Sequence, residues 1–356
     1  MLDDLLTQYV FNKLIDENHP TIEYERCINE KQRKKLCTAC EEACQRGIIK
    51  SVNLKKIDWY KCINCNICVS SCPSRTIRSS YGAMNKILSA YEIKGEEIIL
   101  NCNQEQTYSD VKLYCIAACP WEALACLALE KPVIIVRRNC DNCKEQCTNE
   151  GLIELNLKRV KEFLGEELYN KRIIINDNML PIPEKHFSRR EMFAFMFKKS
   201  RSAISTMLPE DTSIKLDGMV YRKLLANRLK NVEYLNIKQR KFGWRTPIFG
   251  SRCWGCGICE RVCPQKAIHI SKGEKGNGIM NHTAWKCDGC GVCETVCMDK
   301  AIEGMKVVYV DNVFMPIRTK IKSGICKQCG APVKPKDGEE LCMTCYHKKN
   351  SVNGGK

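Results

Sequence analysis

The sequence predicts an α+β multidomain protein, in which two cysteine-rich modules flank a small α/β domain and a helical basic segment, and a cysteine ribbon follows. Three observations support this prediction. The chain has 356 residues, enough for two or three domains, and 27 cysteines that gather in clusters. Three cysteine runs share the spacing C-x2-C-x2-C-x3-C. The middle of the chain instead combines short apolar segments with one apolar helix.

The three complete runs are typical of iron–sulfur ligation. In this spacing, three cysteines on one tight loop hold three irons of a cubane, and the fourth serves the neighbouring cluster. A proline follows the fourth cysteine in two runs, and Met298 follows it in the third. The runs consist of Cys62, Cys65, Cys68 and Cys72; of Cys253, Cys256, Cys259 and Cys263; and of Cys287, Cys290, Cys293 and Cys297.

With these motifs the chain resembles bacterial-type 2[4Fe–4S] ferredoxins and, as a whole, polyferredoxin-like iron–sulfur proteins. The resemblance implies two ferredoxin-like dicluster modules, about four [4Fe–4S] clusters and one-electron transfer. Residues 249–310 are expected to form the second module. By the family's crossed pattern, one of its clusters would bind Cys253, Cys256, Cys259 and Cys297, and the other Cys287, Cys290, Cys293 and Cys263.

Small residues accompany the cysteines of this module. Glycines 255, 257, 289 and 291 would let backbone amides approach the cluster sulfurs. Residues 271–282, between the two runs, are expected to form a Gly/Lys-rich loop. This loop is not a nucleotide-binding fingerprint, because no strand is predicted before it and no helix after it.

Residues 26–85 are expected to form the first dicluster module, whose first motif departs from the family pattern. Cys37, Cys40 and Cys44 keep the spacing. The position of the first ligand is Lys34, and no proline follows the run. Cys27 is expected to loop back and supply the missing thiolate; otherwise it is a buried thiol, and the first cluster is three-coordinate or absent. The crossed pattern would group Cys27, Cys37, Cys40 and Cys72 on one cluster, and Cys62, Cys65, Cys68 and Cys44 on the other.

Residues 86–178 are expected to form a small α/β domain with a parallel sheet. The segments EEIILNC, VKLYC and KPVIIVRRNC read as short buried strands, and PWEALACLALE reads as a helix between the last two. The strand–helix–strand order fits a parallel sheet, and such sheets place their chemistry at the carboxyl ends of the strands. Four cysteines at or near strand ends are therefore expected to converge: Cys102, Cys115, Cys140 and Cys143.

These strand-borne cysteines resemble the iron–sulfur delta subunit of methyl-viologen-reducing hydrogenases, although CDNC replaces that family's histidine-rich segment. The resemblance implies a redox-active site, with an additional [2Fe–2S] or [4Fe–4S] cluster. A zinc site, or a reactive dithiol at Cys140 and Cys143, is the alternative. Cys126 lies on the apolar face of the predicted helix and is expected to be a core residue.

Two further segments lack cysteine. Residues 1–25 are expected to form a helical lead-in, and residues 179–248 a basic helical segment in which Ser188 and Glu191 form a capping box. Between positions 185 and 245, 15 Lys and Arg residues stand against 5 Asp and Glu. The segment is either a solvated linker that packs an apolar stripe on the clusters or a docking face for an acidic redox partner. The stripe includes Val220, Leu224, Leu225 and Leu229.

Residues 320–350 are expected to form a zinc ribbon. Two C-x2-C knuckles follow one another closely, and four thiolates from paired knuckles are typical of a closed structural Zn²⁺ site. A mononuclear iron site is the alternative. The four ligands would be Cys326, Cys329, Cys342 and Cys345.

Composition bears on location and partners. The chain shows no secretory signal and no apolar run of membrane-span length, so its clustered thiols indicate metal sites in a reducing cytoplasm. The formal net charge is +16. Four cubanes and one zinc with their thiolates would remove about ten of these charges. Nucleic acid is therefore an open but not a favoured partner.

The sequence favours a cytoplasmic electron-transfer protein or a subunit of a redox complex. It contains no P-loop, no dinucleotide glycine motif and no histidine ligand pattern, so no catalytic residue is assigned. One alternative is an oxidoreductase whose middle domain carries a substrate-reducing or thiol–disulfide site fed by the clusters. Another is a redox-sensing or nucleic-acid-binding iron–sulfur protein.

Overall fold

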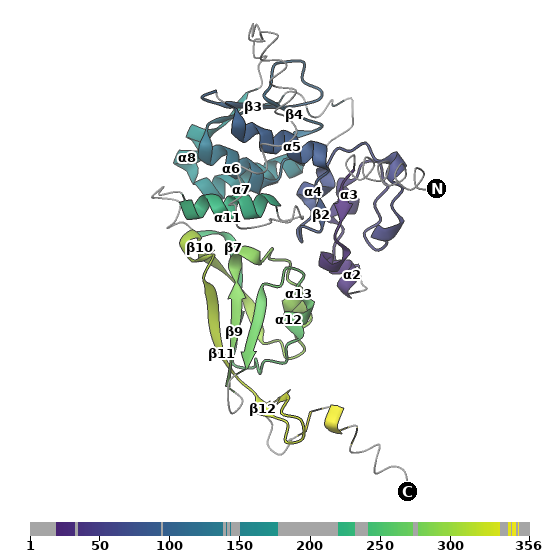
Figure 1. The fold of residues 1–356 in the computed structure, drawn as a ribbon, viewed down its shortest axis with the longest axis vertical. Helices are drawn as coiled ribbons and strands as arrows, with labels where there is room; N and C mark the ends of the chain where they lie inside the picture. Colours follow the sequence, from purple (N-terminus) through teal and green to yellow (C-terminus); the bar gives the residue numbers. More distant parts are fainter. Residues whose placement is uncertain are drawn as a thin grey trace, which may run out of the picture. The chain divides into compact units, whose positions relative to one another are not determined.

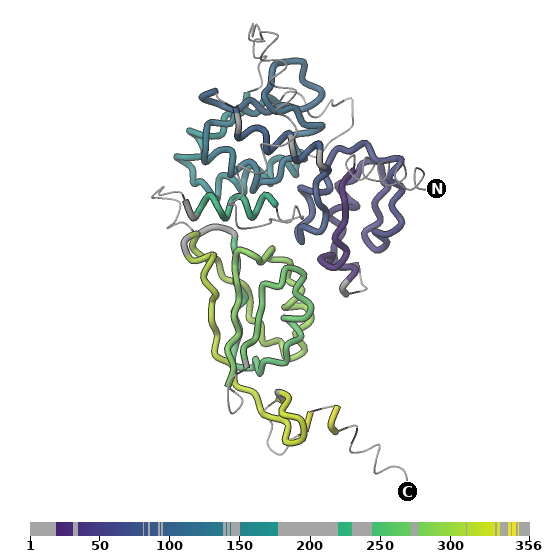
Figure 2. Tube along the Cα trace, viewed as in Figure 1, coloured from purple at the N-terminus to yellow at the C-terminus, as the bar shows by residue number. Residues whose placement is uncertain are grey.

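The computed structural model divides into two compact units, residues 1–237 and 238–356 (Figure 1). Figure 2 traces both by residue number. The expected capping box and most of the basic segment lie outside the described residues, as does the lead-in up to residue 18. The finer domain boundaries predicted from the sequence stay a prediction. The structure describes residues 19–32, 35–93, 95–137, 140, 143, 150–176, 220–231, 241–272, 277–334, 341–342, 344–346 and 348.

The first unit begins with a cysteine-rich module of short helices. Its two-stranded sheet pairs Thr21 with Arg78, so the segment before the first cysteine lies beside the segment after the last. Residues 21–22 are therefore a strand and not part of the expected lead-in helix, because this long-range pairing decides their conformation. The elements are β1 (Thr21–Ile22), η1 (Tyr24–Arg26), α2 (Ile28–Gln32), α3 (Ala39–Ala43), η2 (Leu54–Lys56), η3 (Trp59–Lys61), α4 (Ile67–Ser71) and β2 (Ile77–Arg78).

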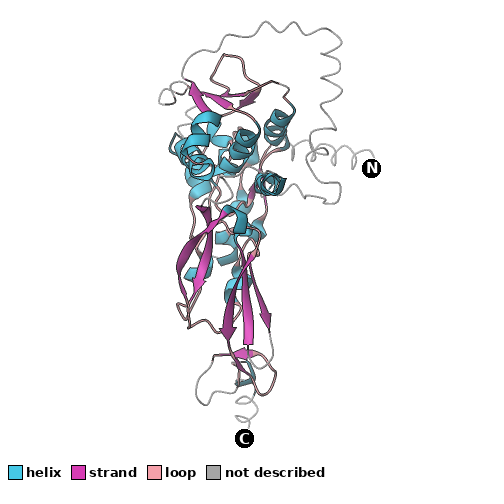
Figure 3. Ribbon diagram, turned by 90° about the vertical axis from the view of Figure 1, so that its left-hand side faces the viewer, coloured by secondary structure: helices cyan, strands magenta, loops and turns pink. Residues whose placement is uncertain are grey.

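The rest of the first unit is built on a four-stranded sheet in the order β4-β3-β5-β6. All three strand pairs are parallel, as the sequence predicts. Figures 1 and 3 show helices gathered on one side of this sheet. The elements are α5 (Tyr81–Ser89), η4 (Ala90–Glu92), β3 (Ile98–Cys102), β4 (Val111–Leu113), η5 (Ile116–Ala118), α6 (Trp121–Glu130), β5 (Val133–Val136), α7 (Glu150–Leu164), α8 (Glu166–Arg172) and β6 (Ile173–Asn176).

The central helix α6 is buried along its whole length except at its last residue, Glu130. Helix α11 (Val220–Asn231) packs against it, and Arg228 forms an ion pair with Glu130 at 2.8 Å. The apolar stripe predicted for this part of the basic segment is buried as expected. It covers a helix of the α/β domain, however, and not a cysteine group. Its buried residues are Val220, Leu224, Leu225 and Leu229.

Among its described residues, the second unit has three antiparallel sheets and the short helices α12 and α13. Strands β7 and β10 form one sheet, β11-β9-β8 form the second, and β12 and β13 form a small third one. Ile268, Met280 and Ile321 make its core, against which Cys253, Cys259 and Cys293 pack. The elements are β7 (Lys241–Phe249), α12 (Ile258–Val262), β8 (Ile268–Lys272), β9 (Asn277–Thr283), η7 (Ala284–Lys286), α13 (Val292–Thr295), β10 (Ile302–Tyr309), η8 (Val310–Asn312), β11 (Pro316–Lys322), β12 (Gly324–Ile325) and β13 (Pro332–Val333).

Two expectations for this unit were wrong. Residues 241–248, assigned to the helical segment, belong to strand β7, which pairs with β10. The expected Gly/Lys loop is largely a hairpin, because β8 and β9 pair across it, with Ile270 opposite Met280. Among the described residues, no helix has the length and apolar composition needed to cross a membrane.

Candidate metal centres

In the second unit the thiols gather in two crossed groups. Burial raises the pKa of the Cys259 thiol to about 12, and repulsion from Cys256, Cys253 and then Cys297 acts in the same direction. Burial likewise raises the pKa of Cys293 to about 12, with Cys290 and Cys263 among the repelling neighbours. Cys259 thus has two cysteines of its own run and the last cysteine of the other run as neighbours, and Cys293 has neighbours from both runs.

The first unit has the same arrangement. Burial raises the pKa of Cys40 to about 12, with added repulsion from Cys72, Cys37 and Cys27 in that order. Burial raises the pKa of Cys65, and here the repelling thiols are Cys62 and Cys44. Cys27 thus lies near Cys40, together with Cys37 and Cys72.

Asn29 fixes the unusual approach of Cys27. Its side-chain oxygen accepts hydrogen bonds from the backbone amides of Leu36 at 2.8 Å and Cys37 at 2.9 Å. Its amide donates to the carbonyls of Cys37 at 2.7 Å and Ser51 at 2.9 Å. Asn29 is buried, so these bonds replace the water that a polar side chain would otherwise need. Sequence reasoning missed this residue, whose only signal was an Asn two positions after Cys27.

Residues with left-handed backbone conformation occur at the same two positions of each complete run. The second and fourth positions after the first cysteine have positive φ, and they are Gly in the second unit but Asn64 and Asn66 in the first. A Cβ on Gly255 would lie 2.4 Å from Cδ1 of Ile321, so a side chain there would be strained and would displace the end of the Ile321 side chain. Asn tolerates this conformation better than most residues, and the buried Asn66 side chain donates to Ser80 Oγ at 3.0 Å.

Backbone amides in the turns of these runs donate hydrogen bonds to cysteine sulfur atoms. The amide four residues after the last cysteine donates to its Sγ in all three complete runs, at 3.4 Å from Thr76, 3.2 Å from Ala267 and 3.2 Å from Ala301. The amide two residues after the first cysteine donates to the Sγ of that first cysteine in two runs, from Asn64 to Cys62 and from Gly289 to Cys287, at 3.4 Å each. Amide donors stabilise thiolate charge and are a means of tuning the potential of an iron–sulfur cluster.

The four groups fit a cubane on chemical grounds. Closely placed buried thiols resist ionisation, so four thiolates require a positive core between them. Two of the groups also border a pocket. One pocket is lined by Cys44, Cys62, Cys65 and Cys68 among mostly apolar side chains, and the other by Cys253, Cys256, Cys259 and Cys297.

The α/β domain collects a fifth set of thiols at the carboxyl ends of its strands. Cys102 ends β3, Cys115 follows β4, and Cys140 and Cys143 follow β5, where β4, β3 and β5 are neighbours in the sheet. Burial raises the pKa of Cys115 to about 12, and repulsion from the other three thiols adds to the effect. Of the remaining cysteines, Cys126 is buried in the core as expected, Cys119 is also buried, and Cys147 lies outside the described residues.

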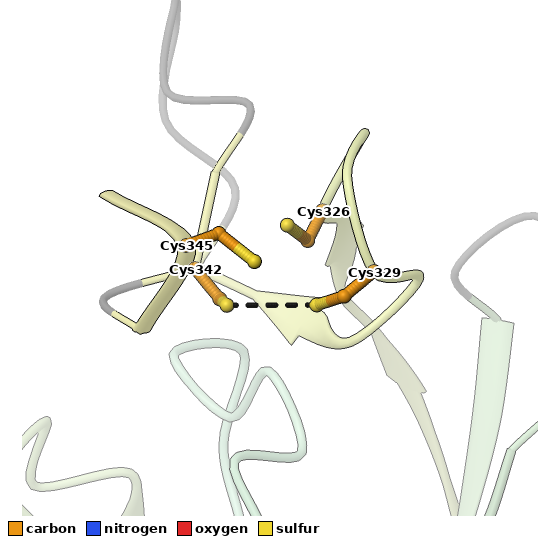
Figure 4. Close-up of side chains that lie close together, drawn as sticks. All are labelled: Cys326, Cys329, Cys342 and Cys345. Atoms are coloured by element: carbon orange, nitrogen blue, oxygen red, sulfur yellow. Dashed lines mark hydrogen bonds between the residues drawn. The ribbon is translucent and has the colours of Figure 1, made fainter. Parts of the chain in front are cut away.

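The ribbon thiols are spaced for a single ion. The sulfurs of Cys326, Cys329, Cys342 and Cys345 lie within 4.8 Å of one another and face inward from two knuckles (Figure 4). The Cys329 and Cys342 sulfurs are 3.6 Å apart, close to the ~3.8 Å that tetrahedral Zn–S bonds of 2.3 Å require. Hydrogen bonds from backbone amides, that of Cys342 foremost, lower the pKa of Cys326 to about 6. No other set of three or more Cys, His, Asp or Glu ligands within the described residues is this compact, as expected if the other thiols surround clusters of several irons.

Comparison with known protein families identifies the class of two of these sites. The 4Fe-4S dicluster domain matches residues 252–301, which contain both runs of the second unit. The 4Fe-4S binding domain matches residues 55–78, which contain the complete run of the first unit. The chain therefore carries ferredoxin-type 4Fe-4S domains in both units. A comparison with curated proteins gave no match.

Proposed function

We propose that the protein is an electron-transfer protein, or an electron-transferring subunit of a redox complex, with four [4Fe–4S] clusters. The crossed grouping of sixteen thiols into four sets of four carries this proposal, together with the matched 4Fe-4S domains. A bound [4Fe–4S] cluster supplies one-electron oxidation and reduction. The protein's own groups hold the thiolates, exclude water and donate amide hydrogen bonds to sulfur.

The ligands of each cluster are part of the proposal. In the second unit we assign Cys253, Cys256, Cys259 and Cys297 to one cluster, and Cys287, Cys290, Cys293 and Cys263 to the other. In the first unit we assign Cys27, Cys37, Cys40 and Cys72 to one, and Cys62, Cys65, Cys68 and Cys44 to the other. The ribbon would hold Zn²⁺ in a closed, structural site, because all four positions around the ion are filled by thiolates.

The thiols of the α/β domain support a second candidate function. Four thiols at the carboxyl edge of a parallel sheet occupy the place where such sheets bind ligands. The resemblance to the hydrogenase delta subunit favours a fifth cluster there, which would act as a relay or as a substrate-reducing centre. If the thiols are free, two of them can reduce a disulfide by thiol–disulfide exchange, while the clusters supply two electrons to regenerate them.

The partner and the compartment follow from the same chemistry. Thiolate-bound clusters favour a reducing cytoplasm. A basic chain favours an acidic redox partner, because charge complementarity raises the encounter rate. Nucleic acid would be favoured only if binding proved steeply salt-dependent.

An anaerobic count of iron, sulfide and zinc, with low-temperature EPR of the dithionite-reduced protein, tests the proposal. About 16 irons and one zinc per chain are expected for four cubanes and a metal-free α/β domain. About 18 to 20 irons would add a fifth cluster there. About eight irons or fewer after full reconstitution, with several zinc ions, would contradict the electron-transfer function.

A further inference from the structure

The position three residues after the last cysteine of each run is largely buried in only one of the four runs. The residue three positions after the last cysteine is left-handed in every run, with φ of 63° at Gly47, 52° at Arg75, 51° at Lys266 and 48° at Lys300. Gly47, Lys266 and Lys300 are exposed, whereas the Arg75 side chain is only 11% exposed. The chain therefore buries one guanidinium beside one cysteine group and leaves the corresponding positions of the other groups in water.

Arg75 contacts the cysteine loop and the α/β domain at once. Its Nη1 donates to the carbonyl oxygen of Cys72 at 2.7 Å. Its Nε donates to Oε1 of Glu122 in α6 at 3.1 Å, and its Nη2 forms an ion pair with the same oxygen. The Glu122 side chain is 1% exposed, so the pair is shielded from solvent on both sides.

Further charged groups surround this pair. Burial lowers the pKa of Arg159 in α7, and repulsion from Arg75 acts in the same direction, while Glu122 and Glu162 oppose it. Arg222 in α11, itself buried, also acts on Arg159. Glu122 of α6 and Arg159 of α7 thus bring charged groups of the α/β domain close to Arg75, on the loop that follows Cys72.

We propose that Arg75 sets the reduction potential of the cluster held by Cys27, Cys37, Cys40 and Cys72, and that Glu122 modulates that potential from the α/β domain. The inference rests on the proposed function, because it requires a cluster at these thiols. Reduction adds one negative charge to the cluster, so a buried positive charge beside it stabilises the reduced form and raises the potential. Exposed lysines at the equivalent positions are screened by water and salt, and have little effect.

Arg75 also acts through the backbone. It holds the carbonyl of Cys72 in the turn from which the Thr76 amide donates to Cys72 Sγ at 3.4 Å. Charge and geometry can be separated, because Lys keeps the charge but cannot reproduce two donor directions at once. Removing the Glu122 charge should shift the potential in the opposite direction from removing the Arg75 charge.

The test is an EPR-monitored redox titration of the full-length, reconstituted protein and its variants. We expect Arg75→Gln to lower one reduction midpoint and leave the others in place. Glu122→Gln should raise that same midpoint, and the double variant should return it toward the wild-type value. Arg75→Lys should recover most of the loss, and the matched controls Lys266→Gln and Lys300→Gln should move no midpoint.

Two results would overturn the proposal. One is an Arg75→Gln protein with its full iron content and unchanged midpoints. The other is an Arg75→Lys protein shifted as far as Arg75→Gln, which would assign the effect to geometry alone. If Arg75→Gln loses iron, the midpoints of Glu122→Gln and Arg75→Lys test the proposal instead, since both variants keep a positive charge at position 75. A failure of the proposed function can be told apart from a failure of this inference. In the former case the wild-type protein itself would show no EPR signal of a reduced [4Fe–4S] cluster.

Discussion

The side-chain amide of Asn156 donates a hydrogen bond to the hydroxyl of Ser70 at 2.8 Å. Ser70 lies in α4 between Cys68 and Cys72, which we assign to different clusters. The same amide donates to the carbonyl of Cys119 at 3.2 Å, on the loop that follows Cys115. With the pair of Arg75 and Glu122, this buried contact makes the cysteine module and the α/β domain parts of one structure, and fixes the position of their thiol groups relative to each other.

We expect Asn156→Ala to lower the stability of the first unit by about 1–3 kcal/mol, because buried partners of a lost hydrogen bond stay unsatisfied. Anaerobic thermal unfolding measures the change as a lower midpoint temperature. Asn281→Ala is the matched control, since Asn281 makes an equivalent bond to Ser271 Oγ at 3.1 Å on an exposed strand. Equal shifts in the two variants would show that the buried contact has no special role.

Cys27→Ala tests the ligand that the atypical run needs. If Cys27 supplies the fourth thiolate, we expect the variant to lose up to about four irons, the content of one cubane, while the other three clusters remain. Cys126→Ala is the control, because Cys126 is buried in α6 outside the thiol groups. Iron analysis and EPR of both proteins provide the measurement. Full iron content in the Cys27 variant would mean that Cys27 is only a core thiol.

The cysteine spacing anticipated which thiols lie near one another, because the neighbours of Cys40 and Cys259 include the last cysteine of the partner run. The strands of the parallel sheet could also be predicted from the sequence, since short continuous apolar segments such as VKLYC are typical of buried strands. Cys27 was harder: no motif includes it, and its placement depends on hydrogen bonds of Asn29 with Leu36, Cys37 and Ser51.

The features that sequence reasoning missed are set by long-range contacts. Strand β7 depends on pairing with β10, about sixty residues away, which outweighs the basic composition around it. The ion pair of Arg75 and Glu122 joins residues 47 positions apart, and no local pattern marks either partner. Asn64 and Asn66 could have been found, because Asn is the common substitute for Gly at left-handed positions, and Gly occupies both equivalent positions in the second unit.

Removing one ribbon thiol should remove one zinc ion and no iron. We expect Cys329→Ser to lose the metal, because a three-thiolate site binds Zn²⁺ more weakly than a closed four-thiolate site. The loss should also loosen the ribbon's contact with the second cysteine module, where Lys334 forms an ion pair with Asp299, two residues after Cys297. Metal analysis after dialysis against a chelator checks this expectation. Retained zinc, or a parallel loss of iron, would contradict a separate structural site.

His282 should make the second unit sensitive to mild acid. It is buried in β9, opposite Ile268 of β8 and Ile317 of β11. Burial lowers its pKa from 6.5 to about 4, and its Nδ1 has no hydrogen-bond partner among the described residues. The folded state therefore binds fewer protons than the unfolded state between these values. The stability that depends on neutral His282 is fully present above pH 6.5 and is lost as the pH falls toward 4.

The expected loss approaches about 3 kcal/mol at the acid end, where His282 is protonated in the unfolded chain but still neutral in the folded one. We expect His282→Leu to remove this dependence, so that the stability difference between variant and wild type grows as the pH falls from 7 to 5. Unfolding of both proteins at each pH measures the difference, in which acid effects shared by the thiolate sites cancel. His269→Leu is the control, because His269 is exposed in the neighbouring strand, with Glu260 2.7 Å from its Nδ1. A constant difference between wild type and His282→Leu across this range would show that His282 does not stay neutral in the folded protein.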